Sequence, residues 1–323
     1  MSVPAAPPSS GSTLLTVLRS RPFLTLLFVA IVWIAASFLT RGFGTYGHLR
    51  YILELASIIG IVAAGQTLVV IGGGIDLSVG AVITVTAITL PLLSPAWDPT
   101  GLAGIAAALV LAAFIGLING IGAAFLRVPP IIMTLAMATL LQGFLVLVAG
   151  GSAVSVENDA VIWLGSARPG GVPADIILWV LVMIGVLVLL HRTATGARFF
   201  AIGANSLAAR LSGVNVERST LLLYTLSGFF AGLAGLLVLG MNRQGYVGIG
   251  DPYLLTSIAA VVLGGTSILG GAGTYAGTIP GSVLLVTITA LITVVNASPG
   301  WRNIMFGGLI LILLLLSGRE KQR

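Results

Sequence analysis

Residues 69–85, VVIGGGIDLSVGAVITV, break a long apolar run with three consecutive glycines and a carboxylate. Each of Gly72, Gly73 and Gly74 lowers helix propensity by about 1 kcal/mol relative to alanine. Asp76 adds a charge that costs about 2.5–3.5 kcal/mol at the centre of a bilayer on insertion scales. Non-helical backbone at membrane depth is tolerated only where it is buried in protein or faces water. The stretch therefore predicts a broken helix packed inside a membrane protein.

The composition supports the membrane interpretation. Charged residues make up 7% of the chain and apolar residues 57%, and the mean hydropathy is +1.13. A soluble domain contains about 25% charged residues. Apolar segments of near-spanning length follow one another from residue 23 almost to the C-terminus. We therefore predict an all-α polytopic membrane protein.

About ten transmembrane helices are expected, and an even number places both termini on one side. The Pro- and Ser-rich residues 1–22 form a disordered cytoplasmic tail, residues 23–317 the transmembrane domain, and residues 318–323 a second cytoplasmic tail. The predicted segments are 23–40, 51–71, 77–93, 101–125, 130–149, 174–190, 220–240, 254–269, 276–295 and 303–317.

The basic residues orient these segments. With the N-terminus inside, ten of the 15 Lys and Arg residues fall in inner loops and five in outer loops, as the positive-inside rule requires. Both termini are then cytoplasmic. Segments two to five and seven to ten are equal in number and begin on opposite faces, which is the pattern of a possible inverted repeat.

Several functions are excluded by composition. The chain has no cysteine, and its two histidines lie far apart, so neither a thiol nucleophile nor a metal site is expected. The net charge of +6 comes from basic residues at segment ends, which is typical of membrane topology and not of nucleic-acid binding. A membrane enzyme would need a cluster of His, Cys or carboxylate residues, which the sequence does not show.

Two interpretations of Asp76 remain open. If a helix starts at Leu77, the carboxylate can cap it by accepting the N–H of Ser78 or Val79. Alternatively, Asp76 lines a substrate pathway or forms the ion site of a secondary transporter. The same two interpretations, a structural role or a place in the substrate pathway, apply to the other polar residues inside apolar segments. The candidate pathway residues are Gln66, Asp76, Ser78, Asn119 and Gln142.

A second glycine-rich stretch, residues 261–282, reads VVLGGTSILGGAGTYAGTIPGS. It lacks the lysine of a phosphate-binding loop and lies between two spanning segments, so no nucleotide site is expected. Small residues that let helices approach closely explain it better. The predicted structural glycines of the two stretches are Gly72, Gly73, Gly74, Gly80, Gly264, Gly265, Gly270 and Gly271.

The hydrophilic loop 191–219 contains a short amphipathic helix. Asn205 is a suitable N-cap and Gly213 a suitable C′ residue, with SLAARLS between them. Leu207 and Leu211 share one face at i, i+4 spacing, and Arg210 lies off that face. Such a helix either rests on lipid headgroups or docks into a partner.

Three motifs resemble the permease subunits of carbohydrate-type ABC importers, the family of the ribose, xylose, arabinose and galactofuranose permeases. They are GGGIDLSVGAV (72–82), AIGANSLAARLSGVNV (201–216) and SIAAVVLGGTSILGGAGTYAGT (257–278). Weaker similarity covers residues 20 to 317. The family often carries an acidic pair before the last motif. Here Leu254 and Thr256 stand at those positions, so no role of that pair carries over.

The resemblance implies an assembly in the bacterial inner membrane. Its members would be this chain, a second identical or related permease chain, a periplasmic substrate-binding protein and a cytoplasmic ATP-binding subunit. ATP and Mg²⁺ would be used by the ATP-binding subunit, and this chain would bind no cofactor and would not be an enzyme. The coupling helix seated in the ATPase would comprise Gly203, Asn205, Ala208, Ala209, Arg210, Leu211 and Gly213.

The sequence thus predicts a permease that imports a monosaccharide or a similar small polar solute from periplasm to cytoplasm. The same architecture could import a nucleoside, an autoinducer or a branched-chain amino acid. An ion-coupled secondary transporter that uses Asp76 is a further alternative.

Overall fold

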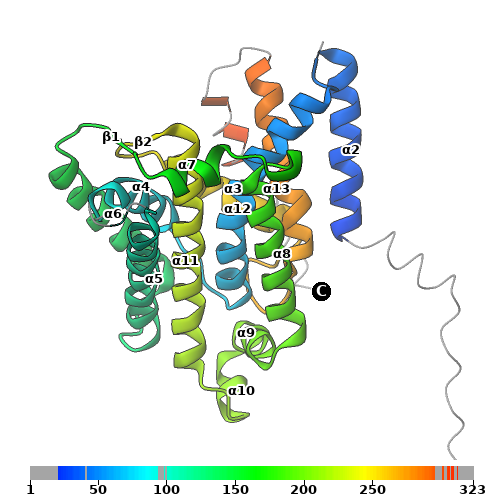
Figure 1. Ribbon diagram of the computed structural model, residues 1–323. Helices are drawn as coiled ribbons and strands as arrows, with labels where there is room; N and C mark the ends of the chain where they lie inside the picture. Colours follow the sequence, from blue (N-terminus) through cyan, green and yellow to red (C-terminus); the bar gives the residue numbers. More distant parts are fainter. Residues whose placement is uncertain are drawn as a thin grey trace, which may run out of the picture.

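The computed structural model describes residues 21–40, 42–93, 98 and 100–294, together with positions 300, 301, 304, 305, 307, 308 and 311. Within these residues the chain is almost entirely helical, and the helices pack side by side as a bundle (Figure 1). The helices are α2 (Arg21–Leu39), α3 (Tyr46–Ile71), α4 (Val79–Leu93), α5 (Leu102–Ala124), α6 (Pro130–Ala149), α7 (Asp159–Ser166), η1 (Pro169–Gly171), α8 (Ala174–Arg192), α9 (Ala194–Ala204), α10 (Ser206–Leu211), α11 (Val216–Asn242), α12 (Asp251–Leu263) and α13 (Tyr275–Val294).

The all-α polytopic prediction is confirmed. In the described part of the chain, six helices are long and apolar enough to span a membrane: α3, α5, α6, α8, α11 and α13. The helices α2, α4 and α12 are also apolar, but their apolar lengths are shorter. Residues 1–20 of the predicted N-terminal tail, the predicted tail at 318–323 and most of the tenth segment, 303–317, lie outside the described residues. The last two residues of the predicted N-terminal tail are helical, because α2 begins at Arg21.

Several helix boundaries differ from the predicted ones. The helices α3 and α11, predicted to start at residues 51 and 220, start at Tyr46 and Val216. Two further differences lie next to the glycine stretches. The segment predicted to begin at residue 77 begins as α4 at Val79, because residues 74–76 are irregular and residues 77 and 78 form a turn. The segment predicted at 254–269 is α12, which begins at Asp251 and ends at Leu263. Its end follows from Gly264 and Gly265, since Gly265 has a left-handed φ of 85° that a helix cannot continue.

The centre of the bundle is formed by α3 and α11. From Ala56 to Ile71 every residue of α3 is buried, and α11 packs against α3, α4 and α5. By contrast α6 buries only Thr134, Met137 and Leu145, so most of its apolar surface faces outward. The broken stretch after α3 therefore lies against the most buried helices of the molecule.

The two ends of the bundle carry different connections. The α10 helix projects at one end, whereas α7 and the strands β1 (Val154–Ser155) and β2 (Gln244–Gly245) lie at the other (Figure 1). The strands pair antiparallel, with Val154 opposite Gly245, and so join the connections 150–173 and 241–253. The end that carries the strands is therefore tied across the sequence by backbone hydrogen bonds.

Buried hydrogen bonds fix α8 to α3 and α13. The indole Nε1 of Trp179 donates to Tyr275 Oη at 3.0 Å, and Tyr275 Oη donates to the carbonyl of Gly60 at 2.8 Å. Ser57 Oγ donates to Asp175 Oδ2 at 2.9 Å. Each of these polar side chains is paired inside the apolar bundle, as buried polar groups must be.

The N-termini of the short helices α4 and α12 meet inside the bundle. A Cβ atom on Gly250 would lie 2.0 Å from the carbonyl oxygen of Gly80, so the two backbones are in direct contact. The backbone N–H of Gly250 donates to Thr84 Oγ1 at 3.1 Å. From this contact α4 and α12 run in opposite directions. The chain after α12 reaches Ile71 at the end of α3, whereas the chain after α4 reaches Asn158, the N-cap of α7.

Candidate functional site

A buried polar cluster forms around Asp76, which is 1% exposed. Its Oδ1 accepts the N–H of Ser78 at 2.9 Å and the hydroxyl of Ser78 at 2.6 Å. Its Oδ2 accepts the hydroxyl of Ser227 on α11 at 2.7 Å. Asn119 Nδ2 on α5 donates to Ser78 Oγ at 2.9 Å. The break between α3 and α4 is thus tied to α11 by the carboxyl group of Asp76 and to α5 by the hydroxyl group of Ser78.

The predicted hydrogen bond from Ser78 N–H to Asp76 is confirmed, and both carboxyl oxygens have partners. The prediction that Asp76 is the N-cap residue is wrong, because α4 begins at Val79 and not at Leu77. This satisfied geometry favours the structural interpretation, because a buried carboxyl with hydroxyl and amide donors needs no further ligand. Sequence reasoning missed Ser227, since one serine beside glycine in an apolar helix carries no sign of a distant partner.

Thr134 in the second turn of α6 supports the same break. Its hydroxyl oxygen accepts the N–H of Leu77 at 3.0 Å, and its hydroxyl lies 3.3 Å from the carbonyl of Ile75 and 3.0 Å from that of Pro130. The threonine is fully buried. It replaces hydrogen bonds that the interrupted helix cannot make for itself.

Gln66 does not join the Asp76 cluster. The residue is fully buried on α3, and neither its amide nitrogen nor its amide oxygen has a hydrogen-bond partner among the described residues. Asn119 Oδ1 and Tyr224 Oη share this condition. Such groups are costly to bury unpaired. They are available to bind a polar solute, or to pair when the helices rearrange.

Gln142 lies apart from both Gln66 and the Asp76 cluster, and its side chain is near the carboxyl group of Asp251 at the start of α12. An open pocket of about 120 Å³ lies at the same end of α12, between α3 and α13. The hydroxyl-bearing side chains of Tyr253, Thr256 and Thr289 line it, and apolar side chains complete its wall. Sequence reasoning named Thr256 as a departure from the family pattern but missed the pocket.

The α10 helix has the caps that the sequence predicts. Asn205 is the N-cap, with its Oδ1 accepting the N–H of Ala208 at 3.0 Å, and Gly213 adopts a left-handed φ of 84° after the helix. Leu207 is 66% exposed and Leu211 is 81% exposed. Two leucines this exposed on a six-residue helix form an apolar knob at the end of the bundle (Figure 1).

A helix that the sequence analysis missed, α9, precedes this knob. Thr193 caps it by accepting the N–H of Gly196, and its buried face includes Phe199 and Ile202. The spacing of these buried residues at i, i+3 and i+6 was the available signal. Because α9 packs on α8 and α3, it holds α10 against the spanning helices.

Four glycines and the end of α3 meet where α9 runs into α10. We call this contact the glycine junction, and it consists of Gly73, Gly203, Gly270, Gly271 and Ile71. A Cβ on Gly203 would lie 1.8 Å from the carbonyl oxygen of Ile71 and 2.7 Å from the nitrogen of Gly271. The N–H of Gly271 donates to that same carbonyl at 2.9 Å. Both glycine stretches therefore contact the α9–α10 loop through backbone atoms.

A single ion pair attaches α10 to α11 within the described part of the chain. The guanidinium of Arg210 pairs with the carboxylate of Glu217 in the first turn of α11. About half of the Arg210 side chain is exposed, and Glu217 is less so. The arginine therefore points across to α11, and the leucines form the exposed surface of the knob.

With this geometry in view, comparisons with known proteins decide the family. A model of the family described as "Branched-chain amino acid transport system / permease component" matches residues 48–314. The chain belongs to this permease family.

The ribose import permease protein of Escherichia coli (strain K12) is 36% identical over 301 residues, which is 92% of this chain and 92% of that protein. The L-arabinose transport system permease protein of the same strain is 33% identical over 302 residues, 92% of this chain and 90% of that protein. The ribose import permease protein of Bacillus subtilis (strain 168) is 32% identical over 310 residues, 93% of this chain and 92% of that protein.

The predicted resemblance to this permease family is thus confirmed. The matched range of the permease begins in the first turn of α3 and includes both glycine stretches and the α10 loop. The geometry groups the predicted residues differently from the sequence. Asp76, Ser78 and Asn119 lie in one cluster, whereas Gln66 and Gln142 lie apart from it. Four of the predicted structural glycines make close backbone contacts: Gly80, Gly264, Gly270 and Gly271. Gly72 and Gly74 instead lie against the side chains of Leu223 and Tyr224.

Proposed function

We propose that this chain is the membrane-spanning permease subunit of an ATP-driven importer for a monosaccharide or a similar small polar solute. The observation that carries this proposal is the match to ribose and arabinose permeases over about nine tenths of both chains. The exposed α10 knob is the surface through which an ATP-binding subunit would move the permease. ATP and Mg²⁺ would act in that subunit, so this chain would not be an enzyme and would bind no cofactor.

We infer that the permease lies in the bacterial inner membrane with α10 on the cytoplasmic side. Among the described residues, basic side chains outnumber acidic ones at the α10 end of the bundle. The arginines there are Arg127, Arg192, Arg198, Arg210 and Arg218, and the acidic residue is Glu217. The positive-inside rule places such a surface in the cytoplasm. This orientation supports ten spans with residues 1–22 and 318–323 as cytoplasmic tails around a transmembrane domain, 23–317. The opposed helices α4 and α12 support an inverted repeat.

The proposed partners follow from this orientation. A periplasmic substrate-binding protein would dock at the end that carries α7, β1 and β2, and deliver solute there. A second permease chain would complete the pathway between two subunits. The pocket with Tyr253, Thr256 and Thr289, and the Gln142–Asp251 pair beside α12, offer hydroxyl and amide groups suited to a sugar. In this proposal Gln66 is a further pathway residue, while Asp76, Ser78 and Asn119 hold the break in place.

The function is tested by reconstitution. The permease, its ATP-binding partner and the binding protein are placed in liposomes with radiolabelled ribose, arabinose or leucine outside. Uptake of a pentose is expected only with ATP and an active ATPase, and an ionophore should leave it unchanged. Uptake by the permease alone that collapses with an ionophore would contradict the proposal and favour an ion-coupled carrier.

A branched-chain amino acid is the second candidate solute, because the family description names that transport class. The same liposome assay separates the two solutes. Leucine uptake without pentose uptake would assign the permease to the second class and leave the ATP-driven mechanism intact.

Arg210→Glu should reduce uptake strongly while membrane insertion stays normal. The substitution places two carboxylates together where Arg210 now pairs with Glu217, so α10 should detach from α11. The double variant Arg210→Glu/Glu217→Arg reverses both charges and should recover most uptake. If the double variant stays as inactive as Arg210→Glu, the arginine acts on the ATPase directly and the ion pair is not its main role. Co-purification of the ATPase and uptake in vesicles measure the two effects.

A further inference from the structure

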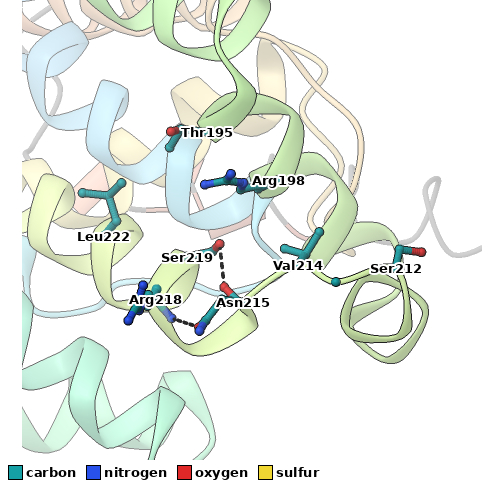
Figure 2. A pocket seen from close by; sticks show the side chains of 9 residues that line it. Thr195, Arg198, Ser212, Val214, Asn215, Arg218, Ser219 and Leu222 are labelled. Atoms are coloured by element: carbon teal, nitrogen blue, oxygen red, sulfur yellow. Dashed lines mark hydrogen bonds between the residues drawn. The ribbon is translucent and has the colours of Figure 1, made fainter.

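A polar pocket of about 470 Å³ opens at the base of α11, beside the α10 loop but not on the exposed face of α10. Figure 2 shows that its lining side chains come from α9, from the turn after α10 and from the first two turns of α11. The residues are Thr195, Arg198, Ser212, Gly213, Val214, Asn215, Arg218, Ser219 and Leu222. The motifs and the proposed transport function assign no ligand to this pocket.

Two arginines give the pocket its charge. Arg198 extends from α9 and Arg218 from the first turn of α11, and both are exposed. Neither makes an ion pair within the described residues, and no lining residue is acidic. The nearby carboxylate of Glu217 is engaged by Arg210. The pocket therefore holds two guanidinium groups that no described carboxylate neutralises. Guanidinium groups in general bind phosphate oxygens through charge-assisted hydrogen bonds.

The remaining polar groups favour an anion as well. Thr195 has a hydroxyl that can donate to an oxygen, whereas the hydroxyl of Ser212 points away from the two arginines (Figure 2). The pocket also lies at the N-terminus of α11, a 27-residue helix whose positive end attracts anions. Asn215 and Ser219 are occupied locally, since Asn215 Oδ1 accepts the N–H of Arg218 at 2.8 Å and Ser219 Oγ donates to the Asn215 carbonyl at 2.9 Å. Asn215 and Ser219 therefore form part of the pocket wall, and the two arginines are the groups that can bind an anion.

The position of the pocket distinguishes among anions. It lies where α8 ends and α11 begins, which is the level of the lipid headgroups for helices that span the membrane. Leu222, one turn beyond Arg218 on α11, is 39% exposed and lines the pocket on its apolar side. Inorganic phosphate has no apolar part that could pack against this wall. A ligand with both a phosphate and a hydrocarbon chain fits both parts.

We propose that this pocket binds the headgroup of an anionic phospholipid from the same leaflet. The phosphate lies between Arg198 and Arg218, and the acyl region follows Leu222 along α11. Because the lipid contacts α9, the turn after α10 and the start of α11 at once, it holds the α10 loop at a fixed height against the spanning helices. The binding requires only that the chain spans the membrane, so it is independent of the proposed transport function.

The test measures lipid binding to the purified full-length chain in a neutral detergent by native mass spectrometry and by thermal shift. Phosphatidylglycerol should bind and raise the melting temperature in a saturable manner, whereas phosphatidylcholine and inorganic phosphate should not. Arg198→Gln/Arg218→Gln should weaken phosphatidylglycerol binding at least tenfold. Arg192→Gln, which removes a charge from the last turn of α8 outside the pocket, should leave it unchanged.

Three results would overturn the proposal. Equal phosphatidylglycerol binding by the double variant would show that the arginines are not the site. Stabilisation by inorganic phosphate alone, matching that by the lipid, would make the ligand a free anion. Loss of ATPase co-purification in the double variant with unchanged lipid binding would assign the arginines to the protein partner. A circular dichroism spectrum of the double variant that matches wild type ensures that weakened binding reports the site and not misfolding.

Discussion

Replacing Gly203 by alanine should lower the melting temperature of the permease by several kelvin and remove most of its uptake. The added methyl group would lie 1.8 Å from the carbonyl oxygen of Ile71 and 2.7 Å from the nitrogen of Gly271. Both are backbone atoms that cannot rotate away. Overpacking of a tight interior typically costs about 1–3 kcal/mol, and occasionally more. The hydrogen bond between Gly271 and Ile71 would be lost as the backbones separate.

The effect on uptake follows from what the glycine junction connects. Gly203 lies in the last turn of α9, directly before α10, and touches the ends of both broken segments. A displacement of α10 by a partner can therefore reach α3 and the α12–α13 connection through rigid backbone contacts. Widening this contact should weaken that transmission even in molecules that remain folded.

Gly185→Ala is the matched control, since it adds the same methyl group to a helix where no atom lies within 4 Å. This control should keep wild-type uptake and melt at or slightly above the wild-type temperature, because alanine favours the helix more than glycine does. Melting of the purified chain and uptake in vesicles are compared for both variants. If Gly203→Ala behaves like Gly185→Ala in both measurements, the glycine junction does not carry the motion.

The features that the sequence predicted well are local or imposed by the bilayer. A spanning helix needs a continuous apolar length, so segments such as 130–149 could be located from the sequence alone. Caps act within a few residues, and for this reason Asn205 and Gly213 could be assigned before the structure. The family match rests on the same local motifs, including the α10 loop.

The features that the sequence did not predict depend on contacts between distant residues. Ser227 and Asp76 are 151 positions apart, and nothing near Ser227 marks it as a partner. Each of the two glycine stretches was recognised in the sequence. The sequence did not predict that Gly73 and Gly270 lie next to Gly203. The end of α12 was placed too late because Ile268 and Leu269 continue the apolar pattern beyond the break. In each case tertiary packing decides what the local pattern leaves open.

Asp76→Ala should impair folding severely and abolish uptake. The substitution removes the acceptor of three hydrogen bonds, from the N–H and hydroxyl of Ser78 and from the hydroxyl of Ser227. Each buried donor that is left without a partner costs about 1–3 kcal/mol. The break between α3 and α4 would also lose its attachment to α11. Detergent-extracted yield and melting temperature should fall well below those of wild type.

Asp76→Asn should be far milder, and this contrast decides between the two interpretations of the carboxyl group. The asparagine oxygen can still accept from Ser78, and its amide N–H can donate to Ser227 Oγ. A structural role therefore predicts substantial uptake by Asp76→Asn. A carrier that binds an ion or a proton at Asp76 needs the charge, so normal assembly with no uptake would contradict the structural role.

A double-mutant cycle with Ser227→Ala locates the effect. If Asp76 acts through its bond to Ser227, the losses of stability from Asp76→Ala and Ser227→Ala should not add, because both remove the same contact. Asp98→Ala, in the connection between α4 and α5, is the control for loss of an acidic side chain outside the cluster. Additive losses in the cycle would show that the Asp76–Ser227 contact contributes little, and that the carboxyl group stabilises the break through Ser78 alone.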